Sequence, residues 1–281
     1  MDEKQEKEIL NFMIELSKEM NNIALKYFKN LKESDSKSKS ETYDDPVTIA
    51  DIEISKMIIK KIKERFNDEV SILCEETKLN INLEKPIFII DEIDGTQKYR
   101  DGKENFCHLL CYYDKEPLIS VIYVPIKNDL YYAIKGKGAF KNNKQIFCSK
   151  NKFSNNKAIF SLTSNKNHYE KYSEIIDKFI KLKKTISYNN PDIKGSFGYQ
   201  GCKLSEGDID FFFGTRPNIW DIASIYLLTK ESGGNCYILR NEKDLFNIKN
   251  WNFNDHYKLN QVPILFTNSF VDEDLFESLR D

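Results

Sequence analysis

The segment that most constrains this chain runs from Ile87 to Thr96 and joins an apolar run to a pair of acids. Four consecutive apolar residues follow Pro86, and three of the four are isoleucine. A short apolar run rich in β-branched residues predicts a buried strand. Because Asp91 and Asp94 follow this run, we expect the strand to end by delivering carboxylates to a cleft.

Two acids three positions apart at a buried strand end need a compensating positive charge, because their repulsion in a medium of low dielectric is costly. A hard divalent cation would supply that charge. Gly95 permits close approach of the backbone, and Thr96 adds a hydroxyl where a helix can begin. The amides of these two residues could then hold a phosphate at a helix N-terminus, so the segment predicts a metal and a phosphate in one turn.

Other interpretations of the same residues exist. Asp94 could simply cap a helix or form a turn. An EF-hand loop does not fit, because Ile93 and Gly95 fall on ligand positions and Gly102 occupies the place of the final Glu. A phosphatase of the haloacid dehalogenase type is a competitor, but Glu92 stands where that motif has its nucleophilic Asp.

Length and composition narrow the class of protein. A chain of 281 residues can form one large domain or two lobes. The 44 acids balance 42 bases, so a nucleic acid polymer is not indicated as a partner. No apolar segment approaches the ~18 to 20 residues of a membrane span, and we expect a soluble, cytoplasmic protein with no membrane partner. Six scattered cysteines without a C-x-x-C pair disfavour a zinc site or a disulfide scaffold.

The first part of the chain combines helices with a meander of strands. An apolar stripe predicts an amphipathic helix over residues 4–29, and a serine-rich, charged segment predicts an exposed loop over 32–44. Thr48 is the expected N-cap of a second helix that carries Asp51 in its first turn. Further strands are expected at residues 71–74, 105–113, 117–124 and 130–134, the first of them ending in Glu75 and Glu76.

The second part alternates strands with helices. The polar segment 149–157 is the best boundary, so we expect one lobe at residues 1–153 and another at 154–281. Strands are expected at 158–162 and 208–213, and helices at 169–182, from Gly195 and Ser196 onward, and at 218–232. Asp221 lies in the first turn of the last helix, where a buried acid must cap the helix, pair with a cation or bind a metal.

Four stretches in this order carry a resemblance: Thr48–Asp51, Glu75–Glu76, Asp91–Thr96, and Trp220–Asp221 with Glu231–Gly234. The chain resembles the inositol monophosphatase superfamily of Mg²⁺-dependent, lithium-sensitive phosphatases, which includes fructose-1,6-bisphosphatases and 3'(2'),5'-bisphosphate nucleotidases. The likeness spans nearly the whole chain. It implies a layered αβαβα sandwich, with an N-terminal α+β lobe holding an antiparallel sheet and most metal ligands, and a C-terminal α/β lobe carrying Asp221.

The resemblance also implies roles for individual residues. The implied ligands of two or three Mg²⁺ ions are Glu75, Asp91, the Ile93 carbonyl, Asp94 and Asp221. The implied catalytic residues are Glu75 with Thr96 and Asp51, the last two hydrogen-bonded to each other as a water-activating pair. The implied substrate contacts are Gly95, Thr96, Gly195, Ser196 and Asp221.

The chain departs from the family pattern at four places: Glu92 for the usual Pro, Cys74 for the usual Gly, Ser224 at a small-residue position, and Gly214 where inositol-specific members carry a substrate-binding Glu. The ten positions from Thr96 to Phe106 and the Ile219-Trp220-Asp221 sequence resemble the bisphosphate nucleotidases. We therefore expect a small phosphorylated metabolite as substrate, most simply 3'-phosphoadenosine 5'-phosphate, with release of AMP.

Three functions stay open at this point: a bisphosphate nucleotidase, an inositol-1-monophosphatase or sugar phosphatase on the same scaffold, and an inactive protein that binds a phosphate ligand. The intact water-activating pair argues against the last. A second phosphate has four candidate partners, namely Lys98, Arg100, Lys203 and Arg216, and either Phe197 or Tyr199 is a candidate for stacking on adenine, with core packing as the alternative. A homodimer is left open.

Overall fold

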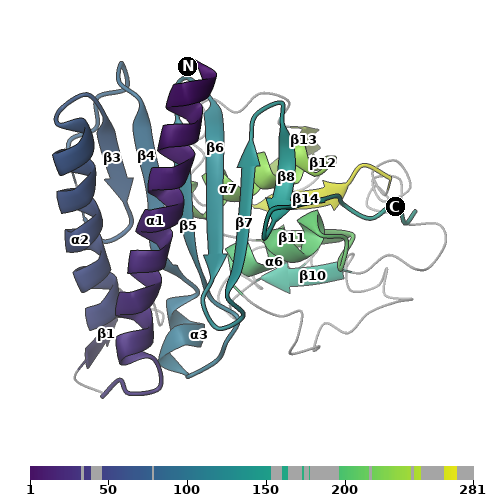
Figure 1. Ribbon diagram of the computed structural model, residues 1–281. Helices are drawn as coiled ribbons and strands as arrows, with labels where there is room; N and C mark the ends of the chain where they lie inside the picture. Colours follow the sequence, from purple (N-terminus) through teal and green to yellow (C-terminus); the bar gives the residue numbers. More distant parts are fainter. Residues whose placement is uncertain are drawn as a thin grey trace.

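The computed structural model describes residues 1–32, 35–38, 46–77, 79–152, 160–163, 173, 177, 196–214, 217–241, 244–247 and 263–270. Within them, helices and sheets alternate in layers (Figure 1). A pair of helices covers one face of a seven-stranded sheet, and a second pair separates that sheet from a five-stranded one. The expected layered α/β sandwich is confirmed, while the helix predicted at 169–182 lies almost entirely outside the described residues.

The outer helical layer contains α1 (Glu3–Tyr27) and α2 (Ile49–Phe66). The helix α1 begins with a capping box between Asp2 and Gln5, and its apolar stripe is buried. Together with the apolar face of α2, this stripe packs against the seven-stranded sheet in one of the two hydrophobic cores. Both helices form where the apolar periodicity predicts them.

The seven-stranded sheet is a meander with one parallel edge, in the order β3-β4-β5-β6-β7-β8-β9. Only β3 and β4 pair in parallel, and the other neighbours are antiparallel. The strands are β3 (Ser71–Cys74), β4 (Ile87–Asp94), β5 (Cys107–Tyr113), β6 (Pro117–Val124), β7 (Asp129–Ile134), β8 (Gly138–Lys141) and β9 (Lys144–Ile146). The predicted antiparallel meander is therefore confirmed.

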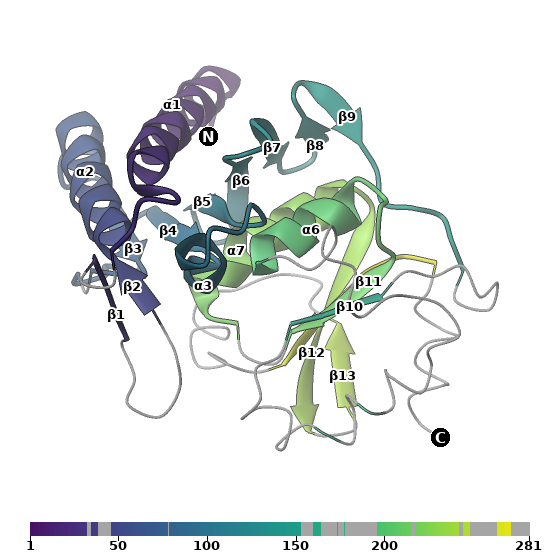
Figure 2. The same cartoon turned by 90° about the horizontal axis from the view of Figure 1, so that it is seen from below.

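The middle layer contains α6 (Phe197–Ser205) and α7 (Ile219–Glu231). Most residues of α7 are buried, because sheets cover it on both sides (Figure 2). This burial explains why its apolar residues are not confined to one stripe. A short helix, α3 (Thr96–Arg100), follows β4 directly.

The five-stranded sheet has the order β10-β11-β14-β12-β13 and is mixed, since β10 and β11 are parallel and the other pairs antiparallel. Its strands are β10 (Phe160–Thr163), β11 (Phe211–Gly214), β12 (Gly234–Asn241), β13 (Asp244–Asn247) and β14 (Ile264–Asn268). The lobe boundary expected after residue 153 falls on residues 153–159, which lie outside the described residues, so the division into two lobes stays a prediction.

One segment differs from the sequence prediction. Residues 36–38, expected in an exposed loop, form β1 (Ser36–Ser38), which pairs antiparallel with β2 (Pro46–Thr48). The pairing joins Ser36 to Thr48 and therefore places this hairpin beside the start of α2. Such a pairing depends on a partner strand that local composition does not reveal.

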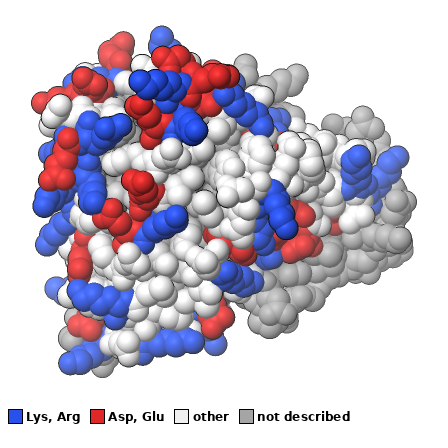
Figure 3. All heavy atoms as spheres, viewed as in Figure 1, with Lys and Arg blue, Asp and Glu red and all other residues white. Residues whose placement is uncertain are grey.

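The surface carries mixed charge. On the face in Figure 3, basic and acidic side chains alternate, and they form no single-sign stripe among the described residues. None of the helices that the structure describes combines the length and apolarity needed to cross a bilayer.

Candidate metal centre

Three carboxylates from separate parts of the chain converge between β4 and α7. One oxygen each of Asp91, Asp94 and Asp221 lies within 4.8 Å of the others. Asp91 and Asp94 lie at the end of β4 and are 2% and 5% exposed. Asp221 occupies the third position of α7, where it accepts a hydrogen bond from the amide of the N-cap residue Asn218.

An irregularity in β4 lets two acids three positions apart face the same side. Regular strand residues at that spacing point to opposite faces of a sheet. Here Asp91 pairs with Leu109 and Asp94 with Cys107, so three steps along β4 match two along β5. This extra residue is a bulge, which turns both carboxylates toward α7.

Glu75 reaches the same edge of the sheet from β3. The parallel register pairs Cys74, the last residue of β3, with Ile90, and the residues that follow these two along the chain are Glu75 and Asp91. Within the described part of the chain, Glu75 is outside the close group of three, but its charge helps to raise the pKa of Asp91. The predicted acidic ligands are therefore neighbours.

Burial and mutual repulsion dominate the electrostatics. Burial raises the pKa of Asp91 well above its ordinary value, and the charges of Glu75, Asp94 and Asp221 raise it further. Burial likewise raises the pKa of Asp221, followed by the charges of Asp94 and Glu75. One oxygen of Asp91, Oδ1, is buried without a hydrogen-bond partner. Three carboxylates this close, two of them buried and Asp221 partly buried, offer the oxygen ligands that Mg²⁺ prefers, so these residues fit the ion.

The N-terminus of α6 anchors Asp94. Its carboxylate accepts hydrogen bonds from the amides of Phe197, at 3.2 Å, and Gly198, and from the thiol of Cys107, at 3.2 Å. These bonds oppose the rise in the pKa of Asp94 that burial causes. A Cβ at Gly198 would lie 2.6 Å from the Cys107 sulfur and 2.8 Å from Asp94 Oδ2, so only glycine fits. The sequence reasoning missed Cys107 and Gly198, because neither carries a local signal of this contact.

Gly95 and Ser196, two predicted substrate contacts, lie against each other. Gly95 caps α3 with φ +88°, a conformation that favours glycine. A Cβ on it would be 2.6 Å from the Ser196 Cβ. Ser196 is the N-cap of α6, and its hydroxyl accepts from the Tyr199 amide. Gly195 is outside the described residues, so its predicted contact stays a prediction.

Thr96 and Asp51 have other hydrogen-bond partners than expected. The Thr96 hydroxyl donates to the Ile93 carbonyl at 2.9 Å. Asp51 accepts from the amide and hydroxyl of Thr48 at 2.8 and 2.6 Å, because it is the acid of a capping box and turns back to the start of its own helix. The expected Thr96–Asp51 bond is not among the hydrogen bonds of the described residues.

The pKa of Asp51 is raised to about 7. Burial is the main cause, hydrogen bonds from Thr48 oppose it, and the charges of Glu76 and Glu75 raise it further. Asp51 therefore lies in the electrostatic field of the acids that follow β3. Its carboxyl can change protonation near neutral pH.

Comparison with known proteins decides the family. The model of the inositol monophosphatase family matches residues 5–261, most of the chain. The chain belongs to the inositol monophosphatase family. Members of this family are Mg²⁺-dependent phosphoric monoester hydrolases sensitive to lithium, so the protein is a phosphatase.

Individual relatives agree with this assignment. The chain is 32% identical to a fructose-1,6-bisphosphatase/inositol-1-monophosphatase of Thermotoga maritima, over 80% of this chain and 82% of that protein. It is 26% identical to the Nus factor SuhB of Xylella fastidiosa, over 82% and 81% of the two chains. This protein superposes on the solved structure of a Thermotoga maritima IMPase with a TM-score of 0.78, and the two sequences are 26% identical. The superposition covers 97% of this chain and 96% of the Thermotoga maritima chain.

Glu92 replaces the proline that the family usually has at this position, and its side chain is fully buried, with 0% of its surface exposed. Burial raises its pKa well above the ordinary value, an interaction with the Ser55 hydroxyl opposes this rise, and the charges of Glu75 and Glu76 add to it. It projects to the opposite face of β4 from Asp91, since it is the next residue along the strand.

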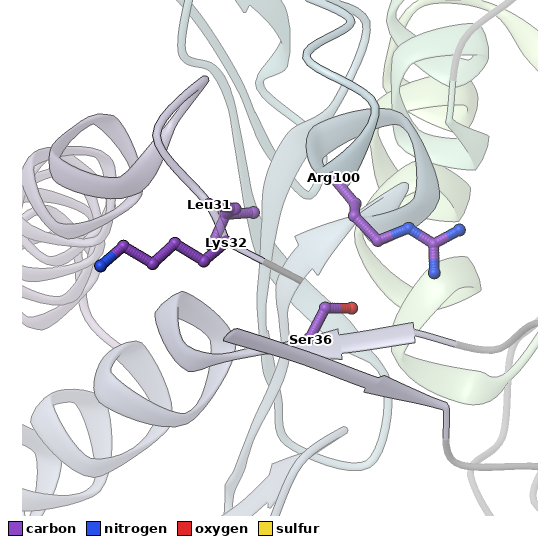
Figure 4. Close-up of a pocket in the computed structure, with 4 residues that line it drawn as sticks. All are labelled: Leu31, Lys32, Ser36 and Arg100. Atoms are coloured by element: carbon purple, nitrogen blue, oxygen red, sulfur yellow. The ribbon is translucent and has the colours of Figure 1, made fainter. Parts of the chain in front are cut away.

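The candidates for binding a second phosphate differ in their surroundings. Lys203 pairs with Glu206 at 2.6 Å and Asp208 at 2.8 Å at the far end of α6, which argues against that role. Arg100 donates to Gln97 and lines a cavity of about 320 Å³ together with Leu31, Lys32 and Ser36 (Figure 4). Arg216 is outside the described residues, and Lys98 lies in α3.

The two aromatic candidates for stacking on adenine are core residues. Phe197 is 6% exposed and Tyr199 is 1% exposed, and both belong to the core between the sheets. The ammonium groups of Lys127 and Lys203 lie over the Tyr199 ring, 4.9 and 5.6 Å from its centroid. Core packing therefore describes both rings better than stacking on a base.

Proposed function

We propose that the protein is a 3'(2'),5'-bisphosphate nucleotidase that hydrolyses 3'-phosphoadenosine 5'-phosphate to AMP and phosphate. The observation that carries the phosphatase chemistry is the convergence of Asp91, Asp94 and Asp221 within 4.8 Å. Support for a nucleotide substrate comes from Gly214, which offers no carboxylate for the hydroxyls of a polyol. Further support comes from the spacing of ten positions from Thr96 to Phe106, which resembles that of the bisphosphate nucleotidases.

The residues proposed to hold two or three Mg²⁺ ions are Glu75, Asp91, the Ile93 carbonyl, Asp94 and Asp221. When bound, the ions supply positive charge to the phosphate and a water of lowered pKa. The α6 amides fix the orientation of Asp94 for this purpose. The capping bond from Asn218 does the same for Asp221.

Other groups of the chain are proposed to orient the phosphate and the water. The amides of Gly95 and Thr96, at the start of α3, hold the phosphate, with Ser196 beside Gly95. Gly195, which lies outside the described residues, is a further proposed substrate contact. Because the Thr96 hydroxyl donates to Ile93, its lone pairs are left to accept a hydrogen bond from the attacking water. Asp51, with a pKa of about 7, is the proposed proton acceptor at neutral pH. Water attacks phosphorus in line and gives a proton to Asp51, and the bond between phosphorus and the ribose 3'-oxygen breaks. The leaving oxygen takes a proton from solvent water, so AMP and phosphate are released.

A second candidate function is an inositol-1-monophosphatase or sugar phosphatase. The name of the Thermotoga maritima relative, a fructose-1,6-bisphosphatase/inositol-1-monophosphatase, favours it. The same carboxylates would serve that reaction, and only the group that bears the phosphate would differ.

Phosphate release separates the two functions. The purified protein is offered 3'-phosphoadenosine 5'-phosphate, inositol 1-phosphate and fructose 1,6-bisphosphate, each with Mg²⁺ and then with added Li⁺. We expect the nucleotide to give the highest kcat/KM and Li⁺ to inhibit. A higher kcat/KM for either of the other two substrates would contradict the nucleotidase proposal while leaving the phosphatase chemistry intact.

A further inference from the structure

The two carboxylate oxygens of Asp94 face different numbers of hydrogen-bond donors. Oδ1 accepts a hydrogen bond from the Phe197 amide at 3.2 Å. Oδ2 accepts two hydrogen bonds, one from the Gly198 amide and one from the Cys107 thiol at 3.2 Å. An ionised carboxylate has about four lone-pair sites, two on each oxygen, so the donors on Oδ2 use both of its sites. The two oxygens are therefore unequally available to a cation.

The donors on Oδ2 are held in place. The Gly198 amide belongs to the first turn of α6 and cannot turn away without unwinding that turn. The Cys107 thiol is equally confined, because its residue is 0% exposed and its sulfur would lie 2.6 Å from a Cβ built on Gly198. The Ser196 hydroxyl lies 3.4 Å from the same sulfur. A cation that approached Oδ2 would have to displace one of these packed donors.

Oδ1 is easier for a cation to reach. Besides the amide on Oδ1, the Ser196 hydroxyl interacts with this carboxylate, since it opposes the rise in the pKa of Asp94. A hydroxyl can rotate away from an arriving ion, whereas a backbone amide in a helix cannot. Oδ1 is therefore the oxygen of Asp94 that is left for a metal ion.

We propose that Cys107, together with the first turn of α6, restricts Asp94 to one metal-binding oxygen and thereby favours Mg²⁺ over Ca²⁺. This inference rests on the proposed role of Asp94 as a metal ligand, and it holds for any phosphorylated substrate. Ca²⁺ takes about six to eight oxygens and can bind both oxygens of one carboxylate, whereas Mg²⁺ requires a near-ideal octahedron with shorter bonds. Blocking Oδ2 removes a two-oxygen contact that Ca²⁺ can use and leaves the one-oxygen contact that suits Mg²⁺. Cys107 acts through Asp94 and is a positioning residue.

Cys107→Ala tests the proposal, because it removes one donor and opens space beside Oδ2. Cys111→Ala is the matched control. Cys111 lies on β5 as Cys107 does, is also 0% exposed and belongs to the same hydrophobic core. Among the described residues, no hydrogen bond joins its thiol to an acid of the candidate centre. The two substitutions therefore remove the same volume from one strand and differ in the contact with Asp94.

Calorimetric titration of the whole protein, first freed of metal by a chelator, gives a Kd for Mg²⁺ and one for Ca²⁺ without any substrate. We expect the affinity for Ca²⁺ relative to Mg²⁺ to rise about 10-fold in Cys107→Ala, the size of effect that a hydrogen-bond partner of a metal ligand commonly has. In Cys111→Ala it should stay within about twofold of wild type. A wild-type ratio in Cys107→Ala, or equal rises in both variants, would overturn the proposal.

A second measurement needs no variant. Crystals of the wild type soaked in Mg²⁺ or in Ca²⁺ should show each ion in contact with Oδ1 of Asp94 and not with Oδ2. An ion bound to Oδ2, or to both oxygens, would overturn the proposal even if Cys107→Ala fails to fold. Wild-type protein that binds neither ion would instead refute the proposed metal centre, and with it the proposed function.

Discussion

At the scale of single residues, the carboxylates near β4 are arranged for binding a cation at the expense of stability. Asp91, Asp94 and Asp221 are close enough to repel one another, and burial removes the water that would screen them. Natural proteins retain such unfavourable groups where function requires them. These carboxylates should therefore increase activity but decrease the stability of the metal-free protein.

Asp221→Asn tests this opposition. The amide retains the shape and can still accept the bond from Asn218, but the charge is removed. We expect kcat to fall at least about 100-fold. We also expect Tm in a chelator to rise, because one repelling charge is gone. Phosphate release and thermal denaturation measure the two effects.

Asp208→Asn serves as the control for this substitution. Asp208 is an acid with a 54% exposed side chain, and it pairs with Lys203 at the end of α6 opposite the amides that bind Asp94. Because its carboxylate is largely hydrated, kcat should be unchanged and Tm should change little. Unaltered turnover in Asp221→Asn would rule out Asp221 as a metal ligand.

The raised pKa of Asp51 predicts that the stability of the protein depends on pH. Its pKa rises from 3.8 to about 7 on folding, so the folded protein binds this proton more tightly than the unfolded chain does. The free energy of unfolding should therefore fall as pH rises from 3.8 to about 7. Asp91 and Asp221 act in the same direction, since burial also raises the pKa of each.

Urea unfolding in a chelator across this pH range gives the measurement. Asp51→Asn removes one titrating group, and its unfolding free energy should fall less steeply with pH than that of wild type. Parallel pH profiles for the two proteins would mean that Asp51 is ionised in the folded state throughout the range.

At the scale of elements, α6 determines how Asp94 is presented. Two amides in its first turn bind the Asp94 carboxylate, where the helix dipole favours a negative charge. The absence of a side chain at Gly198 permits this approach, and the absence of one at Gly201 permits α6 to pack on α7. Gly198 and Gly201 thus have different roles: the first allows contact with Asp94, and the second allows α6 to pack on α7.

Gly198→Ala and Gly201→Ala form a matched pair. The new methyl group at 198 would lie 2.8 Å from Asp94 Oδ2, whereas that at 201 would lie 2.5 Å from Ile225 Cγ2. Each is expected to cost about 1–3 kcal/mol of stability through overpacking. Only Gly198→Ala should also raise the Mg²⁺ concentration needed for half-maximal activity. Identical Mg²⁺ requirements in the two variants would show that α6 does not tune Asp94.

Local patterns predict some of these elements and not others. The apolar run before Asp91 is enough to predict β4, and the continuous apolar face after Asp221 is enough to predict α7. The Cys107 contact to Asp94, the Phe197–Gly214 packing and the β1–β2 pairing join residues far apart along the chain. No periodicity or capping signal encodes such contacts, because they arise only when the layers pack.

At the scale of the whole molecule, the candidate centre lies where layers meet. Asp91 and Asp94 belong to the seven-stranded sheet, whereas Asp221 and the α6 amides belong to the middle helical layer. One hydrophobic core extends from β4 through α6 and α7 to β14. A cation bound by these carboxylates would link the seven-stranded sheet to the middle helical layer.

Magnesium should therefore stabilise the entire fold. At a concentration about 100 times its Kd, a ligand that binds only the folded state adds about 2.7 kcal/mol. We expect Tm to rise with Mg²⁺ in wild type and to rise much less in Asp221→Asn. Calorimetry with a chelator as the reference measures both. A Tm indifferent to Mg²⁺ in wild type would contradict the assignment of the centre.

The anchoring of Asp94 by α6 has a consequence for biogenesis. A nascent chain emerging from the ribosome presents β4 well before α6 and α7 are synthesised. Until those helices arrive, the acids of β4 have neither the amides nor Asp221 beside them, and the strand cannot bury them favourably. Loading with magnesium must then be one of the last events in the maturation of the polypeptide.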